Sequence, residues 1–171
     1  DAYLGPNDPI PPYDYQIPLM SLLHRMGTNL TNVPADIPYL RAPERLDEQW
    51  RDRMKQHTGT KVGVVWGGSP VNQDDGNRSL ALACFAELLE SPGCHFFSLQ
   101  KGDPSGQAAP FIAAGVLTDL ASDIRDFADT AAIIASLDLV ISVDTSVAHV
   151  AGALGKPVWI LLPFAPDWRW Q

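Results

Sequence analysis

The clearest hydrophobic pattern of the chain lies in its last third. Residues 139–143 form a short, β-branched apolar run, which indicates a buried strand. The next three residues, 144–146, are Asp, Thr and Ser, whose side-chain oxygens can cap the first turn of a helix. Apolar residues then recur at helical spacing, at Val147, Val150, Ala151 and Leu154. Gly155 and Pro157 end this helix, and residues 158–162 predict a second strand.

The same alternation of strand and helix patterns begins near residue 60. Further strands are predicted at residues 62–66, at 95–100 and near 116–117. Helices are predicted at residues 79–89, with Ser79 as the cap, at 107–114, and from Asp129 or Thr130 to about 137. Strands that alternate with helices at this spacing are typical of βαβ units. We therefore expect an α/β fold with a mostly parallel sheet.

The first 58 residues follow a different pattern. Eight of the fifteen prolines lie in residues 1–43, which predicts an extended or irregular arm. A short apolar helix can form after Pro18, through Met26, and a solvated helix from Pro43 to about His57. We expect residues 1–58 to be an arm and linker helix, connected to or left over from another domain. Residues 59–171 are expected to be the folded domain.

Composition narrows the class of protein. Hydrophobic residues make up 46% of the 171-residue chain, as in globular proteins, and the net charge is −8 with a pI near 4.7. This balance argues against nonspecific nucleic-acid binding, which needs clustered Lys and Arg. The sequence contains no run of 18 apolar residues, which a membrane span would need, and no signal-peptide pattern. We expect a cytoplasmic protein in which Cys84 and Cys94 are free thiols rather than a disulfide.

The loops that follow the predicted strands hold the candidate site. In a parallel sheet joined by right-handed connections, these loops gather at one edge. They contain glycines, hydroxyl groups and a lysine, which together suit phosphate and sugar binding, at Gly67-Gly68-Ser69, Gln100-Lys101, Asp119-Leu120 and Asp144-Thr145-Ser146. The common dinucleotide-binding and Walker loops are absent, as is the nucleophile elbow of Ser hydrolases. The histidines show no metal-ligand spacing, so no metal site is expected.

Five segments in order carry a family resemblance, at residues 62–70, 77–80, 97–102, 126–132 and 142–158. They resemble the C-terminal, donor-binding half of bacterial glycosyltransferases that are often attached to tetratricopeptide repeats. These proteins are similar to the ADP-heptose:lipopolysaccharide heptosyltransferases and, more distantly, to protein O-linked N-acetylglucosaminyltransferases. The stretch at residues 18–40 resembles the segment that precedes this domain. The resemblance implies one Rossmann-like, three-layer half of a GT-B fold.

The resemblance also implies roles for the site residues. The donor is a nucleoside-diphosphate sugar, and neither a metal nor a further cofactor is needed. The residues that would contact the diphosphate are Gly67, Gly68, Ser69, Thr145 and Ser146. Arg78 or Lys101 would supply positive charge. Base and ribose would lie near Gln100, Asp119 and the Asp129-Thr130 turn. Asp144 would touch the sugar or fix its turn, and His149, one helical turn after Thr145, could face the ligand.

The chain departs from the full enzyme pattern at both ends. No complete Rossmann domain precedes residue 60, and the sequence ends just after the last strand, at Trp168-Arg-Trp-Gln171. The missing half would supply the site for a glycan, lipopolysaccharide or protein acceptor, and the catalytic base. We therefore expect a fragment of a larger protein that binds nucleotide and transfers little or no sugar alone.

Simpler interpretations stand beside these roles. Arg78 could form a surface ion pair with Asp74 or Asp75, Lys101 could be an ordinary turn lysine, and Asp144 could only cap its helix. His149 could be a partly buried, satisfied histidine, and Trp66 is expected in the core. Trp168 and Trp170 could have packed on absent structure. As whole-protein functions, a sugar-nucleotide epimerase half and a non-catalytic sensing or scaffold module remain alternatives, because a fold does not fix a function.

Overall fold

The structure is a computed structural model that describes residues 4–5, 7–34, 36–72, 75–167 and 170. The chain divides into two compact units, residues 1–35 and 36–171. In the first unit, α1 (Leu19–Arg25) begins directly after Pro18, as predicted. None of its residues is buried, and Leu19 and Met20 are about four-fifths exposed. In the described part of the first unit no residue is buried, so this apolar helix has no core around it there.

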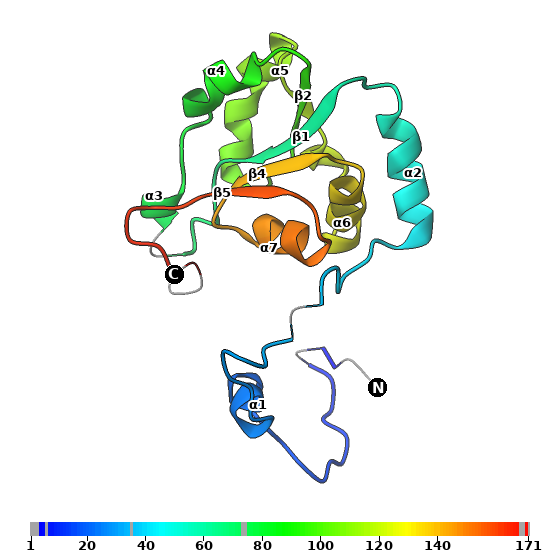
Figure 1. Ribbon diagram of the computed structural model, residues 1–171, viewed down its shortest axis with the longest axis vertical. Coiled ribbons are helices and arrows are strands. Elements are labelled where there is room, and N and C mark those ends of the chain that lie inside the picture. Colours follow the sequence, from blue (N-terminus) through cyan, green and yellow to red (C-terminus); the bar gives the residue numbers. More distant parts are fainter. Residues whose placement is uncertain (1–3, 6, 35, 73–74, 168–169, 171) are drawn as a thin grey trace. The chain divides into compact units, whose positions relative to one another are not determined.

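The second unit is built on a five-stranded sheet (Figure 1). Its strands are β1 (Thr60–Val65), β2 (Cys94–Ser98), β3 (Thr118–Asp119), β4 (Leu139–Val143) and β5 (Val158–Leu161). All neighbouring strands are parallel, in the order β3-β2-β1-β4-β5. The α/β fold with a parallel sheet is therefore confirmed. The strand expected near Val116 forms two residues later, at Thr118.

Helices cover both faces of this sheet (Figure 1). They are α2 (Glu44–Met54), α3 (Asp75–Arg78), α4 (Ala86–Leu89), α5 (Ala109–Ala113), α6 (Phe127–Ala135) and α7 (Ser146–Ala153). Three short 3₁₀ segments complete the connections, at Leu82–Phe85, Asp103–Ala108 and Ala121–Asp123. The helix expected from Ser79 is thus a 3₁₀ turn followed by the short α4, and its N-cap is Ala81.

The core lies in two layers, one on each side of the sheet. Side chains of a strand alternate between its faces. In β1, Val64 packs with Phe85 and Leu89 of the α4 side, whereas Val65 packs on the opposite side with α2, α6 and α7. Trp66 is fully buried, as predicted, and its indole N–H donates to the Pro104 carbonyl at 3.2 Å. The domain is therefore a three-layer sandwich.

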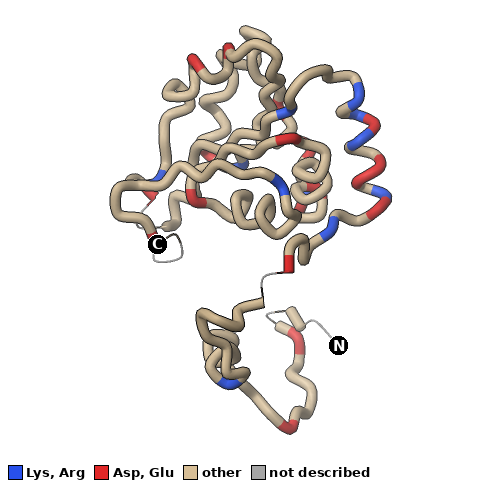
Figure 2. The backbone as a smooth tube through the Cα atoms, in the orientation of Figure 1, with Lys and Arg blue, Asp and Glu red and all other residues tan. Residues whose placement is uncertain are grey.

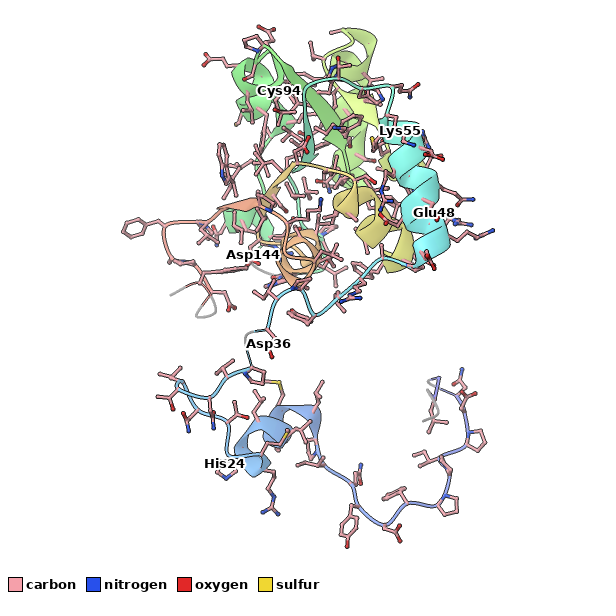
Figure 3. The ribbon with its side chains drawn as sticks, turned by 45° about the vertical axis from the view of Figure 1, so that its right-hand side comes forward. His24, Asp36, Glu48, Lys55, Cys94 and Asp144 are labelled. Atoms are coloured by element: carbon pink, nitrogen blue, oxygen red, sulfur yellow. The ribbon has the colours of Figure 1, made fainter. Side chains whose placement is uncertain are left out.

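Helix α2 belongs to the folded domain. We expected it in an arm of residues 1–58, but its apolar face packs against α6 and the second unit begins at residue 36. Trp50 and Met54 are buried there, while charged side chains such as Glu48 point away from the sheet (Figure 3). Lys and Arg alternate with Asp and Glu along this outer face (Figure 2).

No helix in the described part of the chain combines the length and hydrophobicity that a membrane crossing requires.

Candidate functional site

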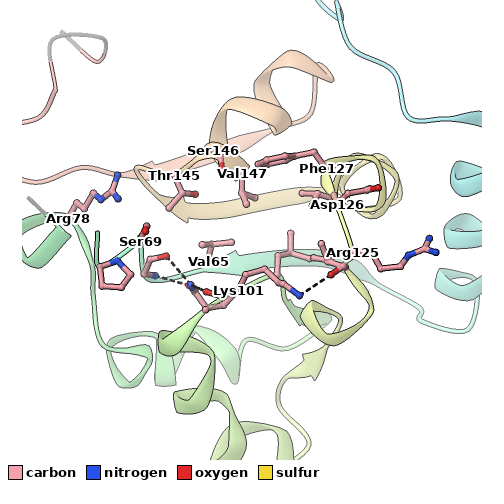
Figure 4. Close-up of a pocket in the computed structure, with 18 residues that line it drawn as sticks. Val65, Ser69, Arg78, Lys101, Arg125, Asp126, Phe127, Thr145, Ser146 and Val147 are labelled. Carbon is pink, nitrogen blue, oxygen red and sulfur yellow. Dashed lines mark hydrogen bonds between the residues drawn. The ribbon is translucent and has the colours of Figure 1, made fainter. Parts of the chain in front are cut away.

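A cavity of about 490 Å³ opens at the carboxyl ends of β1, β2 and β4. The sheet order reverses between β1 and β4, because the chain runs outward from β1 to β3 on one side and from β4 to β5 on the other. Ligands of open α/β sheets bind at such a switch point. Ser69, Arg78 and Thr145 lie toward one end of the cavity, and Asp126 and Phe127 toward the other (Figure 4).

The loop after β1 forms one wall of this cavity and contains Gly67, Gly68 and Ser69. A Cβ on Gly67 would lie 2.8 Å from the ring of Pro104, and one on Gly68 would collide with Asp75 and Arg78. Glycine at both positions therefore lets the backbone approach its neighbours. The Gly68 N–H donates to the Ser79 hydroxyl at 2.8 Å. Ser79, expected as a helix cap, instead fastens this loop.

Gln100 lines the same cavity but is almost completely buried. Its Oε1 accepts hydrogen bonds from the N–H groups of Trp66 and Gly67, at 3.0 and 2.8 Å. Its Nε2 donates to the carbonyls of Gly67 and Lys101. Both ends of the amide are thus occupied by backbone.

Lys101 lies in the cavity wall, and its ammonium group is bound within the protein. The Nζ atom donates to the carbonyl oxygens of Ala121 and Ile124, both at 2.9 Å. The bond to Ile124 is drawn in Figure 4. These carbonyls belong to the loop between β3 and α6. Lys101 is therefore more than a turn lysine, although its charge is directed at backbone.

Arg78 is the cation held at the opposite end of the cavity. Its Nε donates to Asp75 Oδ1 at 3.1 Å, so the ion pair considered from the sequence is present; Asp74 lies outside the described residues. Its Nη1 donates to the main-chain carbonyl of Asp144 at 2.9 Å. The side chain is less than one-fifth exposed, so these two bonds hold the guanidinium in place at the cavity edge.

The first turn of α7 faces the cavity through Thr145, Ser146 and Val147. Thr145 is the N-cap residue by backbone conformation, but its hydroxyl pairs with the Ser142 hydroxyl at 2.9 Å and makes no capping bond. A helix N-terminus carries a partial positive charge and N–H groups without helical partners. The uncapped N-terminus of α7 is therefore suited to binding an anion.

The first turn of α6 also reaches the cavity, but it is capped. The helix begins at Phe127 and its cap is Asp126, three or four residues earlier than the predicted cap at Asp129 or Thr130, because Asp126 accepts hydrogen bonds from the N–H groups of Ala128 and Asp129. Thr130 lines the cavity from within the helix, where its hydroxyl donates to the Asp126 carbonyl. A carboxylate of the chain itself thus occupies the positive end of α6.

Arg125, Asp126 and Phe127 are cavity residues that the sequence reasoning missed. The sequence Asp126-Phe-Ala-Asp129 places an acidic residue at N3 after an Asp cap, which approximates a capping box and could have revealed the helix start. Arg125 donates to both carboxylate oxygens of the buried Asp129, and this guanidinium lowers the pKa of Asp129. Phe127 is 59% exposed and offers an aromatic surface to the cavity.

Three predicted site residues do not line the cavity. The Asp119 carboxylate accepts from the Ala121 N–H at the sheet edge formed by β3. Asp144 contributes its backbone carbonyl to Arg78, while its carboxylate lies 3.9 Å from His149 Nε2. His149 is about half exposed and stacks on Trp170, with ring centroids 4.9 Å apart; Trp168 lies outside the described residues.

A second hollow, of about 350 Å³, lies at the opposite edge of the sheet. Three of the four lysines line it, but each described ammonium there has a partner. Lys55 pairs with Asp52, Lys61 with Asp138, and Lys156 donates to the Leu137 carbonyl. These cations neutralise carboxylates and helix carboxyl ends, so the first cavity is the candidate site.

Comparisons with known proteins indicate the class of protein that the chain resembles. The model of glycosyltransferase family 9 (heptosyltransferase) matches residues 107–161, which include α6, β4 and α7. Protein FlbA of Caulobacter vibrioides is 25% identical over 154 residues, which cover 87% of this chain and 26% of FlbA. The structure is similar to that of E. coli ADP-heptose lps heptosyltransferase II, with a TM-score of 0.57 and 16% identity.

The structural match covers 76% of this chain and 41% of the heptosyltransferase chain. At 16% identity it shows the fold alone, which is a Rossmann-like α/β fold with a parallel sheet. The chain spans about a quarter of FlbA and less than half of the solved enzyme.

Proposed function

We propose that this chain is the donor-binding part of a glycosyltransferase and that its cavity binds a nucleoside-diphosphate sugar. The match to glycosyltransferase family 9 supports a sugar-transferring protein. The observation that carries the proposal is the α7 N-terminus, which lacks a side-chain cap and lies beside Arg78 at the switch point of the sheet. Helix N-termini and guanidinium groups are suited to phosphate oxygens.

The N-terminal ends of α7 and α6 differ, and this difference predicts how the ligand is oriented in the cavity. On this proposal the diphosphate lies against the first turn of α7 and Arg78, because the α6 terminus is already occupied by Asp126. The nucleoside extends toward Phe127 and Ile124, whose apolar surfaces suit a base. Gly67 and Gly68 line the same cavity, and Gly68 lies directly against the Arg78 guanidinium, so the β1 loop borders the proposed diphosphate position.

The chemistry follows from these contacts. Transfer of the sugar leaves a nucleoside diphosphate, and negative charge grows on its phosphates as the glycosidic bond breaks. Fixed N–H groups and the Arg78 guanidinium stabilise that charge without reorganising during the reaction. We propose that these groups act in place of a metal ion, and that the acceptor site and catalytic base lie elsewhere in a larger protein. The free Cys84 and Cys94 are consistent with a reducing, cytoplasmic setting.

A calorimetric titration with ADP, UDP and GDP tests the proposal. We expect one of them to bind and to identify the base. The decisive variant is Ser146→Pro, which removes one N–H from the first turn of α7. Proline is tolerated at that helix position, and Thr145 already has the extended conformation (φ −138°, ψ 168°) that a following proline requires.

Ser146→Ala is the matched control, because it removes the hydroxyl and keeps the N–H. We expect Ser146→Pro to fold as stably as wild type and to bind the diphosphate about tenfold more weakly, in line with loss of one charge-assisted hydrogen bond. Equal binding by a folded Ser146→Pro protein would show that α7 does not hold the phosphates. Absence of binding to all three nucleotides in this chain and in the full-length protein would favour a scaffold module.

A further inference from the structure

Gln100 and Lys101, which follow β2, reach opposite walls of the cavity. Gln100 extends toward the loop after β1, where its amide makes hydrogen bonds to Trp66 N–H, Gly67 N–H and the Gly67 carbonyl. Two of these bonds fix both polar backbone groups of Gly67, which directly precedes Gly68 and Ser69, and the third fixes the Trp66 N–H. The buried Gln100 side chain therefore fixes the backbone of the loop after β1, which forms the first wall of the cavity.

Lys101 extends toward the other wall. Its Nζ atom donates to the carbonyls of Ala121 and Ile124. Ala121 begins a 3₁₀ turn and Ile124 follows that turn, on the way to α6. Ala121 and Ile124 are themselves at least nine-tenths buried. The segment that these carbonyls anchor continues into Arg125, Asp126 and Phe127, which form the far end of the cavity.

We propose that Gln100 and Lys101 are positioning residues, which hold the two walls of the cavity at the separation that the nucleotide requires. On this inference Lys101 remains on its two carbonyls when the ligand binds and does not contact the phosphates. Transfer of its ammonium group to a phosphate would remove the hydrogen bond to the Ile124 carbonyl and leave the Ala121 carbonyl with only the 3.3 Å bond from the Ile124 N–H. The inference rests on the proposed nucleotide site and assigns these residues to its walls rather than to its ligand.

The two possible roles of Lys101 differ in a measurable way. A phosphate ligand would strengthen binding of a nucleoside diphosphate and leave binding of the uncharged nucleoside unchanged. A wall-positioning residue affects both, because the nucleoside contacts the end of the cavity that Lys101 anchors. The ratio of the two affinities therefore separates the roles.

The experiment compares Lys101→Met with the matched surface variant Lys55→Met, whose side chain is 69% exposed. Binding of adenosine, uridine and guanosine and of their diphosphates is measured by titration. Hydrogen exchange of residues 119–128 is measured on the same proteins without ligand. We expect Lys101→Met to weaken nucleoside and diphosphate by the same factor, about tenfold, and to speed exchange in that segment.

Either of two results overturns the inference. One is a loss confined to the diphosphate, which would make Lys101 a phosphate ligand. The other is unchanged exchange of residues 119–128 relative to Lys55→Met. If neither this chain nor the full-length protein binds nucleosides or diphosphates, the proposed function fails, and exchange alone decides whether Lys101 holds the wall.

Gln100→Met gives the corresponding test on the first wall. Its expected result is faster exchange at Trp66 and Gly67, with residues 119–128 unchanged. If this buried substitution prevents folding, the Lys101→Met comparison still decides the inference.

Discussion

Arg78 Nη1 donates a hydrogen bond to the main-chain carbonyl of Asp144, 2.9 Å away and 66 positions later in the chain. This bond joins the segment after β1 to the turn after β4, across the switch point of the sheet. The same guanidinium also donates to Asp75 through Nε. Because the planar group makes both bonds at once, its orientation relative to the α7 terminus is fixed.

Arg78→Lys should therefore weaken nucleoside-diphosphate binding despite conserving charge. An ammonium on a flexible chain cannot make the two directed bonds of the guanidinium, so we expect a loss of about tenfold. Titration with the preferred nucleotide measures it, and Arg53→Lys on α2, 46% exposed, is the control. Affinity equal to wild type would mean that charge alone suffices at this position.

Gly68→Ala should displace Arg78. A Cβ at this position would overlap the Asp75 carboxylate and the Arg78 guanidinium, whereas a Cβ at Gly76 would meet nothing within 4 Å. We expect Gly68→Ala to weaken diphosphate binding by displacing the Asp75–Arg78 pair, and to lower the free energy of unfolding by only about 1 kcal/mol, because the overlapped atoms are the ends of flexible side chains. Gly76→Ala is the control. Urea denaturation and titration measure both effects, and wild-type behaviour of Gly68→Ala would contradict the close approach.

Asp126→Ala should destabilise the domain by about 1 kcal/mol, the usual value of a helix cap. The Asp126 side chain accepts from the N–H groups of Ala128 and Asp129, and asparagine can replace those bonds. We therefore expect Asp126→Asn to retain most of the stability in urea denaturation. Equal losses in the two variants would indicate that charge, rather than capping, is what Asp126 provides.

The Arg125–Asp129 pair should make stability sensitive to acid. Hydrogen bonds from Arg125 lower the pKa of Asp129 below its ordinary value of 3.8. A lowered pKa in the folded state means that the contribution is complete above the ordinary pKa and is lost as the pH falls through the folded-state pKa. Urea denaturation between about pH 5 and pH 2.5 should show a smaller acid loss for Asp129→Asn than for wild type. Identical acid profiles would exclude this contribution.

His57 should produce a separate loss at milder pH. Burial lowers its pKa from 6.5, and the neighbouring charges of His95, Lys61 and Arg53 act in the same direction. The neutral ring packs edge-on against Phe97, with centroids 5.0 Å apart. Stability is therefore full above pH 6.5 and falls as the pH drops from there to the folded-state pKa. His57→Gln should flatten the denaturation profile in that interval, and an unchanged slope would contradict the assignment.

Hydrophobic periodicity predicted the framework of the domain well. The apolar runs at β1, β2, β4 and β5 and the helical stripe of α7 all appear where expected. Most residues of β1, β2 and β4 are buried, and α7 is buried along one stripe, so burial favours their type. The edge strand β5 has no buried residue, and its β-branched apolar run carried that prediction. The strand β3 has only two residues and lies at the sheet edge, which leaves a weak pattern to read.

The candidate site was harder to predict, because polar residues near a strand end can bond to backbone as well as to ligand. Gln100 and Lys101 were expected as ligand contacts, and the structure directs both at main-chain groups. Sequence spacing cannot show which partner a side chain takes. Phe127 was missed because the α6 start was placed at Asp129 or Thr130, inside the helix that Asp126 caps.

The position of β1 at the centre of the sheet determines how the domain must be assembled. One edge of β1 pairs with β2, and the other pairs with β4, in a register that brings Lys61 next to Asp138, 77 positions later. During synthesis one edge of β1, a row of backbone N–H and C=O groups, therefore has no partner until β4 and most of the domain have left the ribosome. Such distant pairing slows folding and exposes a strand edge to other chains. Production of the intact domain will depend on protecting that edge during its synthesis.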